Sequence, residues 1–413
     1  MKRIQLVLNA GSATLKFECF SLEHAEPEAL VRGLIDGVGK AQATIKLKTP
    51  AGETLVQRPL ADSSHASALR AVFELARERD WGLEAVVHRV VHGGALFDGP
   101  VVLDDAKIAR LRELAPLAPL HQPVALAAIE AVSEVAPGVV QIACFDTAFH
   151  IPQDPLATRF GLARRWHDAG VRRYGFHGLS YAAIARKLPG VLGAEEAEKR
   201  VVVMHLGSGS SACAIHRRQS VASSMGFSAV DGLMMGTRPG NLDPEVILYW
   251  IEHEQMSLAD IRAEIYKQGG LLGVSGGLSS DMRELIDNPH PHAQEAVALF
   301  CYRAAREIGA LAVQLGGIDH LVFTAGIGEH ADDSPLLLAG SHGAEYWFPS
   351  EGAVEPAEDD AERGLRDLLR ARAEEIASDY EGVWIEPKTF GFGVHTRNAT
   401  EEAGEKAAAA VDE

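Results

Sequence analysis

The sequence contains one pattern twice, in copies separated by roughly half the chain length. Residues 4–20 (IQLVLNAGSATLKFECF) read as an apolar strand, a turn of small residues and a second strand, and residues 201–216 (VVVMHLGSGSSACAIH) repeat this design. Glycine and serine in both turns allow a tight reversal and expose backbone N–H groups. The spacing predicts a duplicated domain, although any two β-hairpins share some likeness.

The length of the chain also favours two domains. A chain of 413 residues is too long for one ordinary core, and two domains of roughly 200 residues each are expected. Around the two copies, apolar strands alternate with amphipathic helices, which is typical of an α/β fold. Helices are predicted over residues 65–79, 104–115, 123–135, 244–256, 258–268, 290–316 and 352–377, and strands over residues 85–91, 139–145, 319–325 and 383–386.

The net charge limits the expected partners. Lys and Arg number 39 against 57 Asp and Glu, so the formal charge is −18 with histidine neutral. An acidic surface repels phosphate, which argues against nucleic-acid and anionic-membrane binding. A small anionic substrate is still compatible with this charge, because it responds to the local field of a cleft.

The cysteine pattern and the hydropathy favour a cytoplasmic protein. Cys19, Cys144, Cys213 and Cys301 are scattered without a C-x-x-C pair, so we expect neither a disulfide framework nor a thiolate metal site. The sequence has no run of about 18 apolar residues that could span a bilayer. The apolar stretch near the start is too short and too interrupted for a signal peptide.

Polar residues end or interrupt several apolar strands. Asn9 follows IQLVL, and Ser12 and Lys16 come soon after it, which offers amides, a hydroxyl and an amine to an anion. A plain hairpin with solvated polar residues is the simpler interpretation of this group. Arg89 lies inside AVVHRVVHGG, where an arginine is costly unless it is paired or bound to an anion. Asp146 ends VVQIACFD, a position where a carboxylate typically binds Mg²⁺ or a proton.

Glycine-rich segments complete the set of candidate residues. His177 stands between glycines in RRYGFHGLS, Arg238 stands beside a Pro-Gly pair, and FTAGIGEH is a strand with a glycine turn that lets a flat ring approach the backbone. Gly207-x-Gly209 imitates a dinucleotide fingerprint, but the residues after it continue as a strand instead of opening a helix. Two arginines, a carboxylate, a histidine and anion-binding loops fit phosphoryl transfer.

These motifs resemble the acetate kinase family, within the superfamily of acetate and sugar kinases, Hsp70 and actin. The resemblance runs from Asn9 to about Asp379, and eight motifs occur in the family's order: NAGSATLKF, HRVVHGG, LAPLHQP, FDTAFH, RRYGFHG, GLMMGTRPG, GVSGGLSSDMR and FTAGIGE. The resemblance implies reversible transfer of the γ-phosphoryl group between ATP/ADP and a short-chain carboxylate or acyl phosphate. It also implies Mg²⁺ as cofactor and a homodimer.

The fold implied by this resemblance consists of duplicated ribonuclease-H-like domains, the actin-like ATPase arrangement, with a cleft between them. The N-terminal domain would cover residues 1–148 and would be joined by the C-terminal segment of about 383–413. The second, nucleotide-binding domain would cover residues 149–382.

The resemblance assigns roles to the residues that match its motifs. Arg89 and Arg238 would hold the carboxylate and then the transferring phosphoryl group, whose equatorial oxygens His177 would stabilise. Asp146 would act with Mg²⁺, and Asn9 would belong to the same metal site. Supporting roles fall to His121 and His205, ATP binding to Lys16, Ser12, His205, Gly207, Ser208, Gly209, Asp281, Met282, Arg283, Gly326, Ile327 and Gly328, and the acyl pocket to Val91, Leu120, Phe176 and Ala229.

Some positions depart from the family's pattern. Ser208 replaces an Asn that approaches the donor phosphates. The acid that the family places near its C-terminus as part of the Mg²⁺ site is absent, and Glu386 is the nearest one. Ala229 replaces a proline of the acyl pocket, and the room this leaves beside Phe176 predicts a modest preference for an acid larger than acetate.

Two other functions are compatible with the sequence. Ser208 and the missing acid motivate a nucleotide-binding sensor or pseudo-enzyme on the same scaffold. A filament-forming actin-like module is a third interpretation, for which the sequence offers nothing specific. The groups that contact the transferring phosphoryl are all retained, which favours the enzyme.

Overall fold

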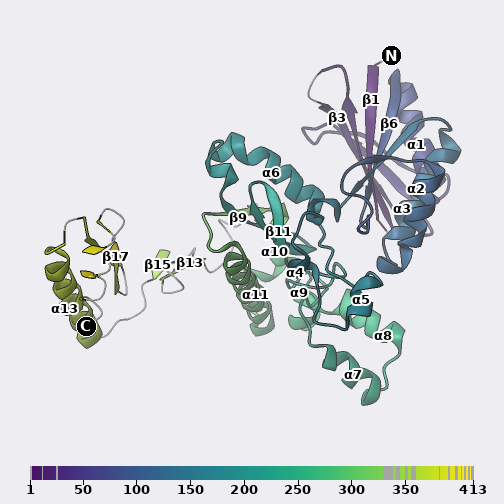
Figure 1. Ribbon diagram of the computed structural model, residues 1–413. Coiled ribbons are helices and arrows are strands. Elements are labelled where there is room, and N and C mark those ends of the chain that lie inside the picture. Colours follow the sequence, from purple (N-terminus) through teal and green to yellow (C-terminus); the bar gives the residue numbers. More distant parts are fainter. Residues whose placement is uncertain are drawn as a thin grey trace. The chain divides into compact units, whose positions relative to one another are not determined.

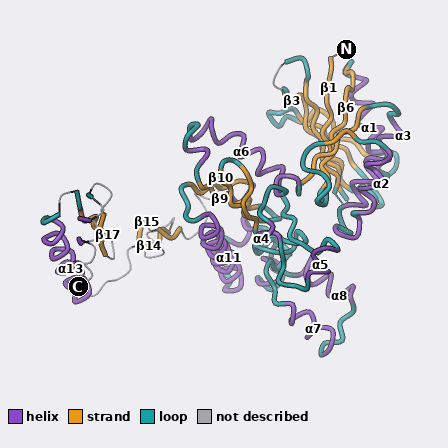
Figure 2. Tube along the Cα trace, in the orientation of Figure 1, coloured by secondary structure: helices purple, strands orange, loops and turns teal. Residues whose placement is uncertain are grey.

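The two repeated segments lie in two separate β-sheets of one structural unit, Met1–Glu329 (Figures 1 and 2). A second unit covers His330–Glu413. The computed structural model describes residues 2–11, 13–24, 27–328, 338–340, 345–348, 352–354, 360–380, 382–388, 391–395, 399–400, 402–403, 406–407 and 410. Ser12, one of the predicted ATP-binding residues, lies outside the described residues.

The first sheet contains the N-terminal copy of the repeat and has the strand order β5-β4-β3-β2-β1-β6-β8-β7. β1 and β2 form an antiparallel hairpin. β6 pairs in parallel with β1, and β8 pairs in parallel with β6. Side chains alternate along β1, so that Ile4, Leu6 and Leu8 are buried. The strands are β1 (Lys2–Ala10), β2 (Thr14–Ser21), β3 (Glu28–Asp36), β4 (Thr44–Lys48), β5 (Thr54–Pro59), β6 (Trp81–Val90), β7 (Val101–Val102) and β8 (Val140–Phe145).

The second sheet repeats the centre of the first. Its order is β11-β10-β9-β12, with β9 and β10 in an antiparallel hairpin and β12 parallel to β9. This order and these directions match β3-β2-β1-β6 of the first sheet, which confirms the duplication predicted from the sequence. The strands are β9 (Arg200–Leu206), β10 (Ser210–His216), β11 (Gln219–Ser223) and β12 (His320–Thr324).

Helices α1 (His65–Glu78) and α3 (Gln122–Val135) pack against each other and cover one face of the first sheet (Figure 1). The Ser64 hydroxyl begins α1 by accepting a hydrogen bond from a first-turn backbone N–H (3.1 Å). Apolar residues at helical spacing, such as Leu69 and Val72, are buried in the core beneath it. Burying each of these side chains contributes about 1.5–3 kcal/mol, so the amphipathic pattern positions the helix.

The second sheet is covered by helices on both faces. α6 (Gly178–Leu192) packs on it through Tyr181 and Leu188, and α11 (Pro291–Leu315) contacts β9, β10 and β11 from the other side (Figure 1). Further helices of this unit are α2 (Asp105–Glu113), α4 (Pro155–Thr158), α5 (Arg164–Asp168), α7 (Pro244–Glu252), α8 (Leu258–Ala263), a π-helix (Glu264–Gln268), α9 (Gly270–Val274), α10 (Met282–Leu285) and α12 (Ala325–Gly328), with 3₁₀ turns at Ala115–Leu117, Ala148–His150 and Glu196–Glu198.

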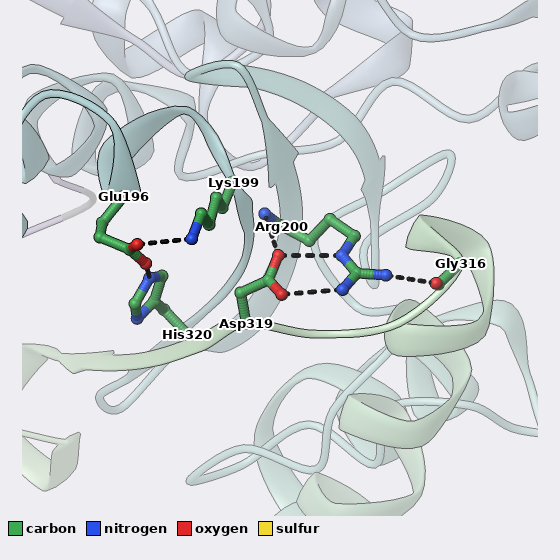
Figure 3. Close-up of polar contacts among 6 residues, drawn as sticks. All are labelled: Glu196, Lys199, Arg200, Gly316, Asp319 and His320. Carbon is green, nitrogen blue, oxygen red and sulfur yellow. Dashed lines mark hydrogen bonds and ion pairs between the residues drawn. The ribbon is translucent and has the colours of Figure 1, made fainter. Parts of the chain in front are cut away.

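The starts of β9 and β12 are joined by a cluster of charged side chains (Figure 3). Arg200 donates to both carboxylate oxygens of Asp319, from Nε to Oδ2 (2.9 Å) and from Nη2 to Oδ1 (2.7 Å). Its backbone N–H donates to the same Oδ2 (2.9 Å). Glu196 binds Lys199 and lies 2.8 Å from His320 Nε2. These contacts fix the register of the two strands at the end of the sheet opposite the β9–β10 turn.

The described residues of the second unit form a small sheet, a helix and a hairpin. β14 pairs with β13 and β15, β16 pairs with β17, and α13 contacts β16. The elements are β13 (Leu338–Gly340), β14 (Glu345–Phe348), β15 (Gly352–Val354), α13 (Asp360–Ala377), β16 (Trp384–Lys388) and β17 (Gly391–His395).

Most predicted elements are present, with boundaries shifted by a few residues. The helix predicted over residues 258–268 is interrupted, since it divides into α8 and the π-helix. The helix predicted over residues 352–377 is wrong at its start: Gly352–Val354 is a strand and α13 begins at Asp360. Glycine lowers helix propensity by about 1 kcal/mol, which favours the later start.

The predicted domain boundary at residue 148, and the assignment of residues 383–413 to the first domain, stay predictions. Strands β3–β5 and helix α6 were not among the predicted elements. No helix within the described part of the chain is both long and apolar enough to cross a membrane.

Candidate active site

Arg89 and Asp146 form an ion pair at the ends of neighbouring strands. Arg89 lies near the end of β6 and Asp146 directly follows β8, and the parallel pairing of these strands brings the side chains together. Arg89 Nε donates to Asp146 Oδ1 (3.0 Å), and Nη2 donates to Oδ2 (2.6 Å). The Asp146 side chain is only 2% exposed, against 34% for Arg89. Burial lowers the pKa of Arg89, but the Asp146 carboxylate outweighs this effect and the pKa is raised.

Asn9 extends this pair across the sheet to β1. Its Oδ1 accepts a long hydrogen bond from Arg89 Nη1 (3.4 Å). Lys16 lies opposite Asn9 in the β1–β2 hairpin, and both line a cavity of about 540 Å³ on this face of the sheet. The structure therefore brings the predicted Asn9, Arg89 and Asp146 together, with Lys16 beside them.

Arg238 is a partly buried cation for which the described residues provide no ion pair. Its Nη1 donates to the backbone carbonyl of Ala229 (2.6 Å). Burial lowers the pKa of its guanidinium group, while Tyr266 acts in the opposite direction. A guanidinium desolvated in this way gains free energy by binding an anion, for which its fork of donors is well suited.

His177 precedes α6 in a left-handed backbone conformation, with φ of 56°. Its Nδ1 lies 2.8 Å from Ser211 Oγ, and the Ser211 hydroxyl also contacts the hydroxyl of Tyr181. We assign the hydrogen bonds as Tyr181 to Ser211 to His177 Nδ1, which leaves Nε2 as the protonated nitrogen. Burial lowers the pKa of His177 well below its usual value, and His205 and two arginines add to this effect. The ring is therefore a neutral hydrogen-bond donor at pH 7.

Arg238 and His177 meet at Gly209, in the turn between β9 and β10. A Cβ atom placed on Gly209 would lie 2.8 Å from Arg238 Nη2 and 3.5 Å from His177 Nε2. Any larger residue would press on the guanidinium, so glycine keeps this space open to a bound group. Arg89 is close enough to contribute to the lowered pKa of His177. Arg238 and His177 thus face one place, and the charge of Arg89 acts on His177 from nearby.

The predicted nucleotide-binding segments surround the same turn. A Cβ atom on Gly207 would lie 3.6 Å from Cβ of Ala325, the first residue of the short helix that contains Gly326, Ile327 and Gly328. The Ser208 carbonyl accepts from the N–H of Gly236 (3.1 Å). A Cβ atom on Gly236 would in turn lie 3.0 Å from the carbonyl of Ser280, next to Asp281.

Asp281 caps α10 and orders the residues that follow it. Its Oδ1 accepts from the backbone N–H of Arg283 (3.0 Å), and both carboxylate oxygens pair with the Arg283 guanidinium. Met282 is buried, whereas the Arg283 side chain is exposed. His205 lies near the end of β9, where the centroid of its ring is 4.4 Å from the ring centroid of His177.

The four residues predicted for the acyl pocket line one cavity, which has a volume of about 20 Å³. This is room for one small group. His121 also lines it, and the pKa of His121 is lowered by burial and by the nearby charges of Arg238 and Arg89. The pocket therefore adjoins the arginines. Its lining comprises Val91, Leu117, Ala118, Pro119, Leu120, His121, Phe176, Ser228, Ala229 and Tyr266.

Asp146 and Asn9 supply oxygen atoms of the kind that Mg²⁺ binds. This hard cation usually takes one or two carboxylates and keeps waters and phosphate oxygens as its other ligands. Within the described residues, no group of three or more His, Cys, Asp or Glu side chains could hold a metal ion alone. The donor set fits a metal shared with the phosphates of a nucleotide.

Sequence reasoning missed three residues of this site. Ser211 and Tyr181, which hold His177, lie inside a strand and a helix without any distinguishing motif. Tyr266 lines the acyl pocket from the π-helix, which an α-helical pattern does not reveal.

Comparisons with known proteins show similar sequences and structures over most of the chain. The model of the acetokinase family matches residues 4–337, so the match ends before Asp379, where the resemblance was expected to end. An acetate kinase of Rhodopseudomonas palustris (strain TIE-1) is 50% identical over 339 residues, covering 81% of this chain and 84% of that protein.

Two solved structures are also similar over most of the chain. The crystal structure of the Porphyromonas gingivalis acetate kinase has a TM-score of 0.72 at 36% identity, over 79% of this chain and 84% of that one. The crystal structure of a propionate kinase from Francisella tularensis has a TM-score of 0.75 at 30% identity, over 80% of this chain and 85% of that one.

Proposed function

The chain belongs to the acetokinase family, and from this premise we propose that it transfers the γ-phosphoryl group of ATP reversibly to acetate or propionate, giving an acyl phosphate and ADP. It is a phosphotransferase with a carboxyl group as acceptor. The observation that carries the proposal is the convergence of Arg238 and His177 Nε2 on Gly209, beside a small apolar pocket that Arg89 and Arg238 adjoin.

The acid would bind with its carboxylate toward the arginines and its alkyl group in the pocket. Arg238 lacks an ion-pair partner among the described residues, so an anionic ligand would relieve the cost of its burial. The pocket volume of about 20 Å³ supports a chain of one or two carbons beyond the carboxylate. The predicted preference for an acid larger than acetate stays a prediction.

Transfer requires positioning and charge neutralisation more than proton movement. A carboxylate oxygen forms a bond to the γ-phosphorus while the bond from that phosphorus to the bridging oxygen of ADP breaks, and the bonding pair leaves with ADP. The carboxylate is already ionised, so the site needs no base. Negative charge on the transferring group would be stabilised by Arg89, Arg238 and the neutral N–H of His177.

ATP would lie on the second sheet. We assign its phosphates to the Gly207–Gly209 turn, with Lys16 across from them, and its adenosine to Asp281–Arg283 and Gly326–Gly328. The closeness of Ala325 to Gly207 supports one continuous nucleotide site. The hydroxyl of Ser208 is shorter than the family's amide, so it would reach the phosphates less directly.

Mg²⁺ is the cofactor that this site would use. Asp146 and Asn9 would hold it, and when bound it would neutralise phosphate charge. Both carboxylate oxygens of Asp146 already accept from Arg89, so water and ATP would have to supply most of its ligands.

A homodimer is proposed on the basis of α7. None of its residues is buried, although six consecutive ones, Val246 to Ile251, are apolar or aromatic. Leu248 is 47% and Ile251 is 42% exposed. An exposed apolar face of this kind favours association with a second copy. The predicted cytoplasmic location stays a prediction.

An acyl-phosphate assay tests the proposed function. Purified protein is incubated with ATP, Mg²⁺ and acetate, propionate or butyrate, and hydroxylamine traps the product as a hydroxamate. We expect hydroxamate and equal amounts of ADP with acetate and propionate. Tight ATP binding without hydroxamate from any acid would instead support the nucleotide-binding sensor.

A further inference from the structure

We propose that Tyr266 forms the wall of the acyl pocket that limits the length of the acid. The inference rests on the proposed carboxylate kinase function and adds a specificity-determining residue to it. It differs from the expectation based on Ala229 alone, which considered only the room that a small residue leaves.

The pocket has two kinds of lining. The small residues Ala118, Ser228 and Ala229 leave space, and larger apolar groups, including Phe176 and Tyr266, fill it. The cavity that results has a volume of only about 20 Å³ despite the alanine at position 229. Larger lining residues therefore fill part of the room that Ala229 leaves, and of these larger residues Tyr266 comes from a segment outside the predicted motifs.

Backbone contacts fix Tyr266 relative to Arg238. Tyr266 lies in the π-helix after α8, and its carbonyl accepts from the hydroxyl of Thr237, the residue before Arg238 (2.9 Å). The chain that follows continues this attachment, because the N–H of Leu271 donates to the carbonyl of Met235 (2.9 Å). These hydrogen bonds therefore hold the segment of Tyr266 against the segment of Arg238.

Tyr266 lines the pocket from a π-helix. A π-turn holds one more residue per hydrogen-bonded ring than an α-turn and so rotates the side chains that follow it, and such turns often occur at functional sites. The side chain of Tyr266 also influences Arg238, since charge on its oxygen would act against the burial that lowers the pKa of that guanidinium. Tyr266 therefore belongs to the wall of the pocket and is attached beside Arg238.

The test compares acids of increasing length in four proteins. We would measure kcat/KM by hydroxamate formation for acetate, propionate and butyrate in the wild type, Tyr266→Ala, Tyr266→Phe and the control Tyr302→Ala. Tyr302 is 65% exposed on α11 and does not line the pocket. One methylene group in such a pocket is worth about 10- to 200-fold in specificity.

We expect Tyr266→Ala to raise the ratio of butyrate to acetate by about tenfold or more. Tyr266→Phe keeps the ring, so its ratio of butyrate to acetate should stay within about twofold of the wild-type ratio. The same holds for the ratio in Tyr302→Ala. An unchanged ratio in active Tyr266→Ala would overturn the inference, and so would an equal rise in either of the other variants. If Tyr266→Ala does not fold, as judged by circular dichroism, Tyr266→Leu takes its place with the same criteria. Wild-type protein that forms no acyl phosphate from any acid would overturn the proposed function itself, and the inference with it.

Discussion

Replacing Ser211 with alanine tests how His177 is held in the orientation proposed for catalysis. Ser211 and Tyr181 are fully buried, and the serine hydroxyl contacts both the tyrosine hydroxyl and His177 Nδ1. In the assigned chain of donors, Ser211 accepts from Tyr181 and donates to the imidazole. The substitution removes both bonds at once. His177 then loses the group that keeps the proton on Nε2, the nitrogen that faces Gly209.

The sizes of the two effects follow from these contacts. A buried hydroxyl left without a partner costs about 1–3 kcal/mol, so Ser211→Ala should lower the free energy of unfolding by that amount through Tyr181. The bond to Nδ1 is between neutral groups and is worth about 0.5–1.5 kcal/mol. Its loss should reduce kcat by about two- to tenfold if the bond acts mainly in the transition state.

A double variant separates stability from catalysis. Tyr181→Phe combined with Ser211→Ala removes both hydroxyls, so no donor is orphaned, and part of the lost stability should return while kcat stays low. Urea unfolding gives the stability, and the hydroxamate assay gives kcat. Wild-type kcat in Ser211→Ala would refute the orienting role. A double variant less stable than Ser211→Ala would refute the reasoning about the orphaned hydroxyl.

Three further predictions concern the two arginines of the site, the Arg200–Asp319 ion pair and the proposed dimer. Arg238→Ala should lower kcat by about a thousandfold with little change in the free energy of unfolding. Arg89→Ala should lower kcat as well and should also lower the free energy of unfolding in urea by about 3 kcal/mol, because it leaves the buried Asp146 carboxylate unpaired. Equal stability of the two variants would contradict this difference. Asp319→Asn should lower the unfolding midpoint clearly at pH 7 and by less at pH 2.5. The hydrogen bonds from Arg200 lower the pKa of Asp319, so its contribution is complete above the unfolded-state pKa of about 3.9 and declines as the pH falls from there toward the lowered pKa of the folded state. An equal effect at both pH values would contradict this. Leu248→Glu should convert the proposed dimer to a monomer in light scattering, and a monomeric wild type would rule out that dimer.

Much of the fold could be predicted because its signals are local. The alternating strands and the amphipathic α1 and α3 follow from side-chain periodicity, and the duplication follows from two turns of the same composition. Helix α6 was missed because it begins after a left-handed residue and contains Pro189 and an adjacent glycine near its end, all of which argue against helix locally.

The site divides in the same way. Asn9 and Asp146 could be recognised because polar groups at the ends of apolar strands are conspicuous in a sequence. Ser211 and Tyr266 could not, because their importance lies in what they touch: a ring nitrogen from another segment in one case and an apolar cavity in the other. Such contacts depend on tertiary packing, for which local periodicity carries no signal.

The different environments of the two arginines have an evolutionary consequence. A substitution of Arg89 alone leaves the buried carboxylate of Asp146 unpaired, so a lineage that loses Arg89 first passes through a less stable protein. Arg238 has no such safeguard, because its side chain bonds a backbone carbonyl and its desolvation opposes folding. In a lineage that no longer moved phosphoryl groups, Arg238 would be the first of the two to decay.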